Sequence, residues 1–247
     1  MRATLVCALA AVACSGTSSQ PAAPLSSHHE APPAVQRDTP APHIGWAEHR
    51  FALAGLPAVA KDGSLAVVAV DDGDGGRGYP NLRIEVRDRG DRVVDKRQVL
   101  LSDDYERLVP GDEPGPELAR RIDDANALLA DLHARHDLQK AAPLVLEDPH
   151  DTERLPITAS GDDGLEVAWQ SPRIVVRRGT STLATVDGTA WLPRPGKRCP
   201  TCEPCANPAF LGAVTKSPGI DLVVVELAFS GTDMCWEPGH QFHVVAW

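Results

Sequence analysis

The apolar and polar residues in the first half of the chain follow a pattern that predicts three β-strands. The run 65–70 is almost wholly apolar, which is typical of a strand covered on both faces. Segment 82–87 alternates apolar and charged residues, so we expect one of its faces to contact solvent. A turn at 88–91 leads into a third segment, 93–100. Together these segments predict a three-stranded antiparallel meander.

Between Pro114 and Asp137 the pattern changes to that of a helix. Apolar residues recur there at steps of three and four, at Leu118, Ile122, Ala125, Leu129 and Leu132. Glu117 near the start and Arg135 near the end carry the charges that stabilise each end of a helix dipole. Alternating segments then resume at 165–169, 173–178 and 182–186. The turns between them are short enough for hairpins, so we expect a second antiparallel meander.

An internal repeat links the two halves of the chain. The segment AVAKDGSLAVVAV (58–70) can be laid over AVTKSPGIDLVVV (213–225). Each copy continues through a loop that contains Gly and Pro into a last alternating strand, 82–87 or 242–247. The motif resembles the strand–turn–strand signature of TolB-like and WD-repeat propeller blades, in which an Asp-Gly turn precedes an apolar strand. The resemblance implies that one β unit is used twice.

The expected fold class is therefore mainly β with one helix (α+β), built from antiparallel meanders in a blade-like or sandwich arrangement. A small β-propeller is the alternative. A closed propeller typically needs four or more blades of four strands. Only two or three candidate blades can be found, and the helix interrupts them, which favours the sandwich.

The N-terminal residues have the pattern of an export signal. Arg2 precedes an apolar stretch that ends at Ala13, and this stretch is shorter than the ~20 residues that span a bilayer. Its end, AVAC (11–14), resembles the lipobox of bacterial lipoproteins. The resemblance implies that the Cys14 thiol is acylated and that residues 1–13 are removed. An ordinary secretory signal cut near Ala13, with Cys14 incidental, is the alternative, and it also exports the chain.

The sequence after Cys14 predicts a tether followed by one folded body. Residues 14–43 are rich in Pro, Ser and Ala and offer almost nothing to bury, so we expect them to form an extended linker. Residues 44–247 are expected to form a single β-rich domain with two related halves, about 44–140 and 150–247. Ser15 follows Cys14, which resembles the sorting signal of enteric lipoproteins for the outer membrane. The expected location is the bacterial cell envelope, membrane-anchored and facing the periplasm.

The remaining cysteines of the exported body form a cluster, Cys199, Cys202 and Cys205, with Cys235 further along. In an oxidising compartment an even number of cysteines predicts disulfides, and four cysteines permit three connectivities. The C-x2-C-x2-C spacing also suits a zinc or iron–sulfur site. A redox pair formed by Cys202 and Cys205 is a further alternative.

The acidic loop after the first strand contains weak candidates for calcium ligands, Asp72 and Asp74. Carboxylates and glycines that alternate in this way can wrap a calcium ion. Counted from Asp72, however, the twelfth position of an EF-hand loop falls on Arg83 and not on a carboxylate. An acidic hairpin turn is the favoured interpretation, so we expect no metal and no cofactor.

The net charge and the absence of known motifs disfavour several classes of function. The chain has 24 Lys and Arg against 34 Asp and Glu, a net charge of −10, without the basic cluster that a nucleic-acid partner requires. It contains no G-x-S-x-G, no H-E-x-x-H and no phosphate-binding P-loop, and we assign no catalytic residue. The sequence predicts a non-enzymatic protein that meets the membrane through its lipid and binds an envelope protein or polymer. The alternatives are an exported enzyme with an unrecognised active site and a metal-binding protein that uses the cysteines.

Overall fold

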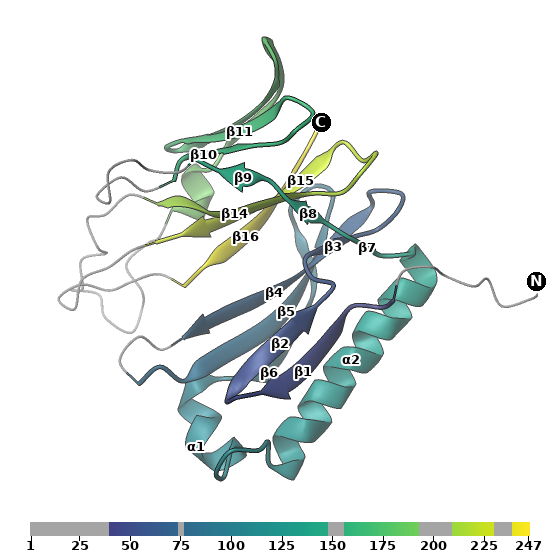
Figure 1. Ribbon diagram of the computed structural model, residues 1–247, viewed down its shortest axis with the longest axis vertical. Helices are drawn as coiled ribbons and strands as arrows, with labels where there is room; N and C mark the ends of the chain where they lie inside the picture. Colours follow the sequence, from purple (N-terminus) through teal and green to yellow (C-terminus); the bar gives the residue numbers. More distant parts are fainter. Residues whose placement is uncertain (1–39, 74–76, 148–155, 193–208, 230–238) are drawn as a thin grey trace, which may run out of the picture. The chain divides into compact units, whose positions relative to one another are not determined.

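The computed structural model describes residues 40–73, 77–147, 156–192, 209–229 and 239–247 (Figure 1). This part of the chain is mainly β, with several antiparallel sheets and one long helix. The predicted α+β class is confirmed. No helix in the described ranges has the length and apolarity needed to cross a membrane.

The first sheet contains the meander predicted from the sequence. Its strand order is β6–β5–β4–β3–β7, and all neighbours are antiparallel. The strands are β3 (Ala58–Val59), β4 (Leu65–Gly73), β5 (Pro80–Asp88), β6 (Val93–Leu100) and β7 (Gln139–Lys140). The turn between β5 and β6 is held by Asp88, whose Oδ1 accepts a hydrogen bond from the Gly90 N–H at 2.9 Å.

One face of this sheet is covered by the helix and by a hairpin that the pattern did not predict. The helix is α2 (Pro116–His136), and the hairpin is β1 (His43–Ala47) with β2 (Arg50–Ala54). Asn126 of α2 joins the two elements, because it accepts from the Ile44 N–H at 2.8 Å and donates to the Ile44 carbonyl at 2.9 Å. Strand β1 begins at His43, the last residue of the predicted tether 14–43, and residues 1–39 lie outside the described part of the chain.

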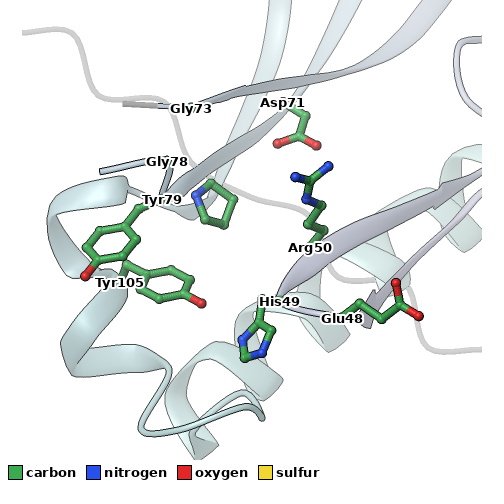
Figure 2. Close-up of a pocket in the computed structure, with 9 residues that line it drawn as sticks. Glu48, His49, Arg50, Asp71, Gly73, Gly78, Tyr79 and Tyr105 are labelled. Atoms are coloured by element: carbon green, nitrogen blue, oxygen red, sulfur yellow. The ribbon is translucent and has the colours of Figure 1, made fainter. Parts of the chain in front are cut away.

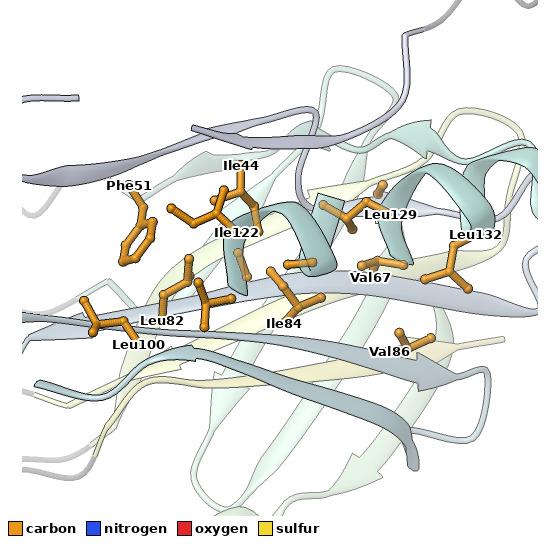
Figure 3. Close-up of a cluster of buried hydrophobic side chains, with 14 of the residues drawn as sticks. Ile44, Phe51, Val67, Leu82, Ile84, Val86, Leu100, Ile122, Leu129 and Leu132 are labelled. Atoms are coloured by element: carbon orange, nitrogen blue, oxygen red, sulfur yellow. The ribbon is translucent and has the colours of Figure 1, made fainter. Parts of the chain in front are cut away.

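The apolar stripe of α2 faces the core as its spacing requires. Figure 3 shows Ile122 and Leu129 beside Ile44 of the hairpin, above Ile84 of the sheet. The five predicted apolar positions of the helix are all buried. A 3-10 turn, η1 (Ser102–Asp104), and a short helix, α1 (Tyr105–Leu108), connect β6 to α2.

Two further sheets contain the rest of the described chain. One has the order β13–β12–β11–β10–β9 and includes the second predicted meander, and the other has the order β16–β15–β14–β8. The first comprises β9 (Val145–Leu146), β10 (Thr158–Ser160), β11 (Leu165–Gln170), β12 (Arg173–Arg178) and β13 (Ser181–Asp187), followed by η2 (Thr189–Trp191). The second comprises β8 (Ala142–Pro143), β14 (Phe210–Lys216), β15 (Leu222–Ala228) and β16 (Gln241–Ala246).

The sheet containing β15 packs on both of its faces. Val224 belongs to an apolar cluster with Val68 of the first sheet, whereas Val223 and Val225 belong to a cluster with Val167 of the β11 sheet. Because successive side chains of a strand point to opposite faces, both sets of β15 side chains are buried. This packing explains why residues 222–225 are continuously apolar.

Both copies of the internal repeat are hairpins followed by a third antiparallel strand. In the first copy β3 pairs with β4, and β4 with β5. In the second copy β14 pairs with β15, and β15 with β16. The two copies face one another through the cluster that contains Val68 and Val224.

The face of β5 that was expected to contact solvent is instead buried, and its charges are paired. Arg83 Nε donates to Glu85 Oε1 at 2.9 Å, and Arg87 Nη2 donates to Glu85 Oε2 at 2.8 Å. Arg87 Nη1 donates to Asp91 Oδ1 at 2.9 Å, and Asp91 Oδ2 lies 2.8 Å from His243 Nδ1 of β16. Only 5% of Glu85 and 9% of Arg87 is exposed. The prediction was wrong because alternating charges can pair with one another under a covering sheet.

The electrostatics of Glu85 agree with this pairing. Burial raises the pKa of this carboxyl, but hydrogen bonds from Arg83 and Arg87 and their positive charges outweigh it, so the pKa lies below its ordinary value. We name this row of side chains, Arg83, Glu85, Arg87 and Asp91, the charged row.

Candidate functional site

A cleft of about 520 Å³ lies where the tip of the β1–β2 hairpin meets the ends of β4 and β5 (Figure 2). Its volume falls within the roughly 300–1,000 Å³ of small-molecule sites. Its lining is mostly polar and is made by Glu48, His49, Arg50, Asp71, Gly73, Gly78, Tyr79, Pro80 and Tyr105. The cleft therefore brings together three segments that are far apart in the sequence.

The hairpin turn presents two of these side chains from an unfavourable backbone conformation. Ala47 pairs with Arg50, so Glu48 and His49 form a two-residue turn, and their φ angles are 52° and 62°. A turn of this kind favours Asn-Gly, because most side chains resist positive φ. Such residues cost on the order of 1–3 kcal/mol each, and they are concentrated at functional sites. Two strained residues that both line a cleft suggest that their side chains are needed there.

Replacing this turn by the favoured pair tests that interpretation. The double variant Glu48→Asn with His49→Gly is expected to raise the free energy of unfolding by about 1–2 kcal/mol, because the strain is relieved. Urea unfolding monitored by circular dichroism measures the change. His43→Gly, in the adjoining strand, is the control and should not stabilise the protein. A double variant less stable than the wild type would contradict the strain interpretation.

Arg50 and Asp71 face each other in the cleft. Figure 2 shows the guanidinium of Arg50 at the start of β2 and the carboxylate of Asp71 near the end of β4 pointing toward one another. Within the part of the chain that the structure describes, neither side chain makes a hydrogen bond or an ion pair within 4.0 Å. Both groups therefore keep their hydrogen-bonding capacity for a ligand.

The surroundings of Asp71 disfavour its charge. Partial burial raises the pKa of this carboxyl, and the neighbouring Asp72 raises it further, while Arg50 and His240 act in the opposite direction. The net shift is upward. A titratable group with a raised pKa in an open cleft is a candidate for a binding or catalytic role.

The raised pKa of Asp71 predicts how stability depends on pH. The folded state holds the proton more tightly than the unfolded state, so ionised Asp71 lowers stability once the pH rises through the ordinary value of 3.8 and the raised value above it. At pH 7 Asp71→Asn is thus expected to leave the melting temperature unchanged or to raise it by about 1 °C. Below pH 3 the gain should vanish, because wild-type Asp71 is then protonated.

Substitution of Asp163, a carboxylate with a lowered pKa, should change the melting temperature in the opposite direction. A hydrogen bond from Lys216 lowers the pKa of Asp163, so Asp163→Asn is expected to lower the melting temperature at pH 7. Scanning calorimetry of both variants measures the difference. A fall for Asp71→Asn as large as that for Asp163→Asn would contradict the proposed environment of Asp71.

The two tyrosines of the chain form one wall of the cleft. Their rings stack with centroids 4.3 Å apart and an interplanar angle of 15°. Tyr79 Oη donates to Glu106 Oε1 at 2.9 Å, and this hydrogen bond raises the pKa of the phenol. Tyr105 also contacts the Trp46 ring, with centroids 6.4 Å apart. Because each ring is held by a neighbour, the wall has a defined position.

The calcium candidate Asp72 lies outside this cleft. Adjacent side chains of a strand point to opposite faces, so Asp72 points away from Asp71 toward the charged row. Its Oδ1 accepts from Asn81 Nδ2 at 2.6 Å, and its Oδ2 lies 3.6 Å from Arg83 Nη1. The described residues contain no group of three or more His, Cys, Asp or Glu side chains placed to hold a metal ion. Asp74 lies outside the described residues.

The cysteine predictions also fall outside the described part of the chain. This holds for Cys14, the predicted lipidation site, and for Cys199, Cys202, Cys205 and Cys235, the predicted disulfide cysteines. Their acylation and pairing therefore stay predictions from the sequence.

The sequence predicted no cleft here: the acidic loop that contains Asp71 and Gly73 was considered only for calcium, with Asp72 and Asp74 as the candidate ligands. Glu48 and His49 carry no turn signal, because such signals rest on Gly, Asn and Pro. The remaining lining residues could not be recognised as a site, because they come together only in the folded chain, where β2, β4 and α1 meet. The restriction of tyrosine to two positions, Tyr79 and Tyr105, is the one compositional signal that could have pointed here.

No family model, no curated protein and no solved structure matches this chain.

Proposed function

We propose that this protein is exported, anchored to a membrane of the bacterial envelope through a lipid on Cys14, and binds a small polar ligand in the cleft at the β1–β2 turn. The lipobox-like end of the signal sequence supports the anchor. The Pro-rich composition of residues 14–43 supports a tether. The observation that carries the binding role is the cleft, where Arg50 and Asp71 face each other beside a strained turn and make no ion pair within the described residues.

The predicted tether has the length that such a role needs. A linker of about 30 residues spans roughly 30 Å as a random coil and up to about 90 Å as an extended polyproline helix. The cleft would then stand clear of the membrane and reach soluble or polymeric envelope components. Binding without catalysis is favoured because none of the sequence motifs of hydrolases or transferases considered above is present.

A second candidate function, an exported enzyme, is favoured by one observation. The pKa of Asp71 is raised above the ordinary aspartate value, and carboxyls with a raised pKa can serve as general acids or bases. The two functions differ in the fate of the ligand. A binding protein returns it unchanged after prolonged incubation, whereas an enzyme returns a product that mass spectrometry detects.

Fractionation of cells tests the anchor. The wild-type chain is expected in the membrane fraction, and Cys14→Ser is expected in the soluble exported fraction. Cys7→Ser, within the apolar part of the signal, is the matched control and should stay with the membrane. An equal distribution of the two variants would contradict lipid anchoring at Cys14.

Sedimentation with isolated envelopes tests the binding role. The exported Cys14→Ser form, mixed with envelopes from cells that lack the protein, is expected to sediment with them. Adding Arg50→Gln should reduce the sedimented fraction about tenfold, because a charge-assisted hydrogen bond is lost. Arg97→Gln, at an exposed position of β6, is the control. Equal sedimentation of both variants would contradict a role for the cleft.

A further inference from the structure

We infer that the cleft takes a small zwitterion of the amino-acid class, with the ligand carboxylate on Arg50 and the ligand ammonium on Asp71. The inference rests on the binding role proposed above and names the chemistry of its ligand. Two sources could supply that chemistry. One is a free amino acid, and the other is a cell-wall peptide with a residue whose α-carbon carries both an unblocked ammonium and an unblocked carboxylate.

The first step concerns the charges of the lining. A guanidinium and a carboxylate point toward one another, yet no ion pair within 4.0 Å joins them in the described part of the chain. They come from different elements, Arg50 from β2 and Asp71 from β4. A ligand that carries both signs on one carbon can satisfy both groups at once. A simple anion would meet Asp71, and a simple cation would meet Arg50, so each is disfavoured.

The second step concerns the geometry of each group. The guanidinium has a planar array of donors that matches the two oxygens of a carboxylate. The Asp71 carboxylate accepts hydrogen bonds, and the neighbouring Asp72 of the same strand adds negative charge to its surroundings. An ammonium donates three hydrogen bonds and suits this acidic side.

The third step concerns size. The cleft of about 520 Å³ has room for more than the head group of an amino acid. The stacked rings of Tyr79 and Tyr105 lie on the other side of the cleft from Arg50 and Asp71 in Figure 2. They offer a firm surface to the ligand's side chain or to the peptide that carries the head group.

Isothermal titration calorimetry with blocked analogues tests the inference. The full mature chain is titrated with L-alanine, with N-acetyl-L-alanine, which lacks the ammonium, and with L-alanine amide, which lacks the carboxylate. Alanine is expected to bind, and each blocked analogue is expected to bind about 10- to 100-fold more weakly. Equal binding of alanine and either analogue would overturn the inference.

Variants assign the two ends of the ligand. Arg50→Gln and Asp71→Asn should each weaken alanine binding about tenfold or more, and Arg97→Gln should leave it unchanged. The exchanged pair, Arg50→Asp with Asp71→Arg, should recover part of the loss, because a zwitterion can bind in the reverse direction. Circular dichroism establishes that each variant is folded. Unchanged alanine binding in the folded Arg50→Gln variant would overturn the assignment.

A muropeptide with a free diamino-acid end distinguishes the two sources. Tighter binding of the muropeptide than of alanine points to the wall polymer as the source. Tighter binding of alanine points to a free amino acid. Either result supports a ligand of the zwitterion class. If Arg50→Gln abolishes sedimentation with envelopes while neither zwitterion binds, the zwitterion inference fails and the binding role stands. If alanine binds while sedimentation is absent, the inference stands and the envelope role fails.

Discussion

Deletion of residues 242–247 is expected to abolish folding, since these residues complete two of the apolar clusters. Phe242 and Val244 of β16 pack toward the first sheet, and Val245 and Trp247 pack toward the β11 sheet. Burial of one such side chain contributes about 1.5–3 kcal/mol. The four together are comparable with the roughly 5–15 kcal/mol that stabilises a whole domain.

The deletion also removes polar contacts between sheets. The Val244 N–H donates to Asp91 Oδ1 at 2.8 Å, and Arg89 Nη2 donates to the Trp247 carbonyl at 3.0 Å. Circular dichroism and thermal unfolding of the shortened chain measure the effect. Deletion of residues 20–25, in the predicted tether, is the control and should leave the transition unchanged. A cooperative transition at the wild-type temperature after deletion of 242–247 would contradict the role given to β16.

Glu85→Ala is expected to destabilise the protein by about 3–5 kcal/mol, because it leaves buried positive charge without its partner. Glu85 lies between Arg83 and Arg87 and accepts hydrogen bonds from both. Asp91 compensates Arg87 in part, and Asp72 lies 3.6 Å from Arg83. Neither replaces the shared carboxylate at the centre of the charged row.

Urea unfolding at pH 7 measures this cost. Glu166→Ala is the matched control, since Glu166 lies 3.8 Å from Arg177 and both side chains are partly exposed, at 43% and 42%. Ion pairs that solvent reaches contribute about 0–1 kcal/mol. The lowered pKa of Glu85 determines how its contribution to stability changes with pH. Its contribution is present above the ordinary value of 4.5 and is lost as the pH falls through the lowered value. The two variants losing equal stability would contradict the burial of the charged row.

The elements with a clear period could be predicted from the sequence. The helix 116–136 follows the spacing of 3.6 that burial of one face imposes, and the meander strands were marked by alternation or, in β4, by a continuous apolar run. The short strands β7, β8 and β9 could not be found, because two residues contain no period. The β1–β2 hairpin was missed because its turn lacks the residues that usually mark one.

The charged row and the cleft depend on contacts that no local pattern contains. Alternation of Ile84 and Val86 with Arg83, Glu85 and Arg87 is the same for a solvated face and for a paired, covered one. Only the position of β16 decides between them. The cleft likewise depends on where the tip of the hairpin lies relative to β4, and this position is set by tertiary packing.

Intact-mass analysis of the membrane-extracted protein, with and without reductant, tests the proposal of export and lipid anchoring most directly. We predict a chain that begins at an acylated Cys14 and gains about 4 Da on reduction, the mass of the hydrogens that open two disulfides. A chain that retains residues 1–13, carries no acyl group, shows no mass change on reduction and is recovered from the cytosol would contradict it.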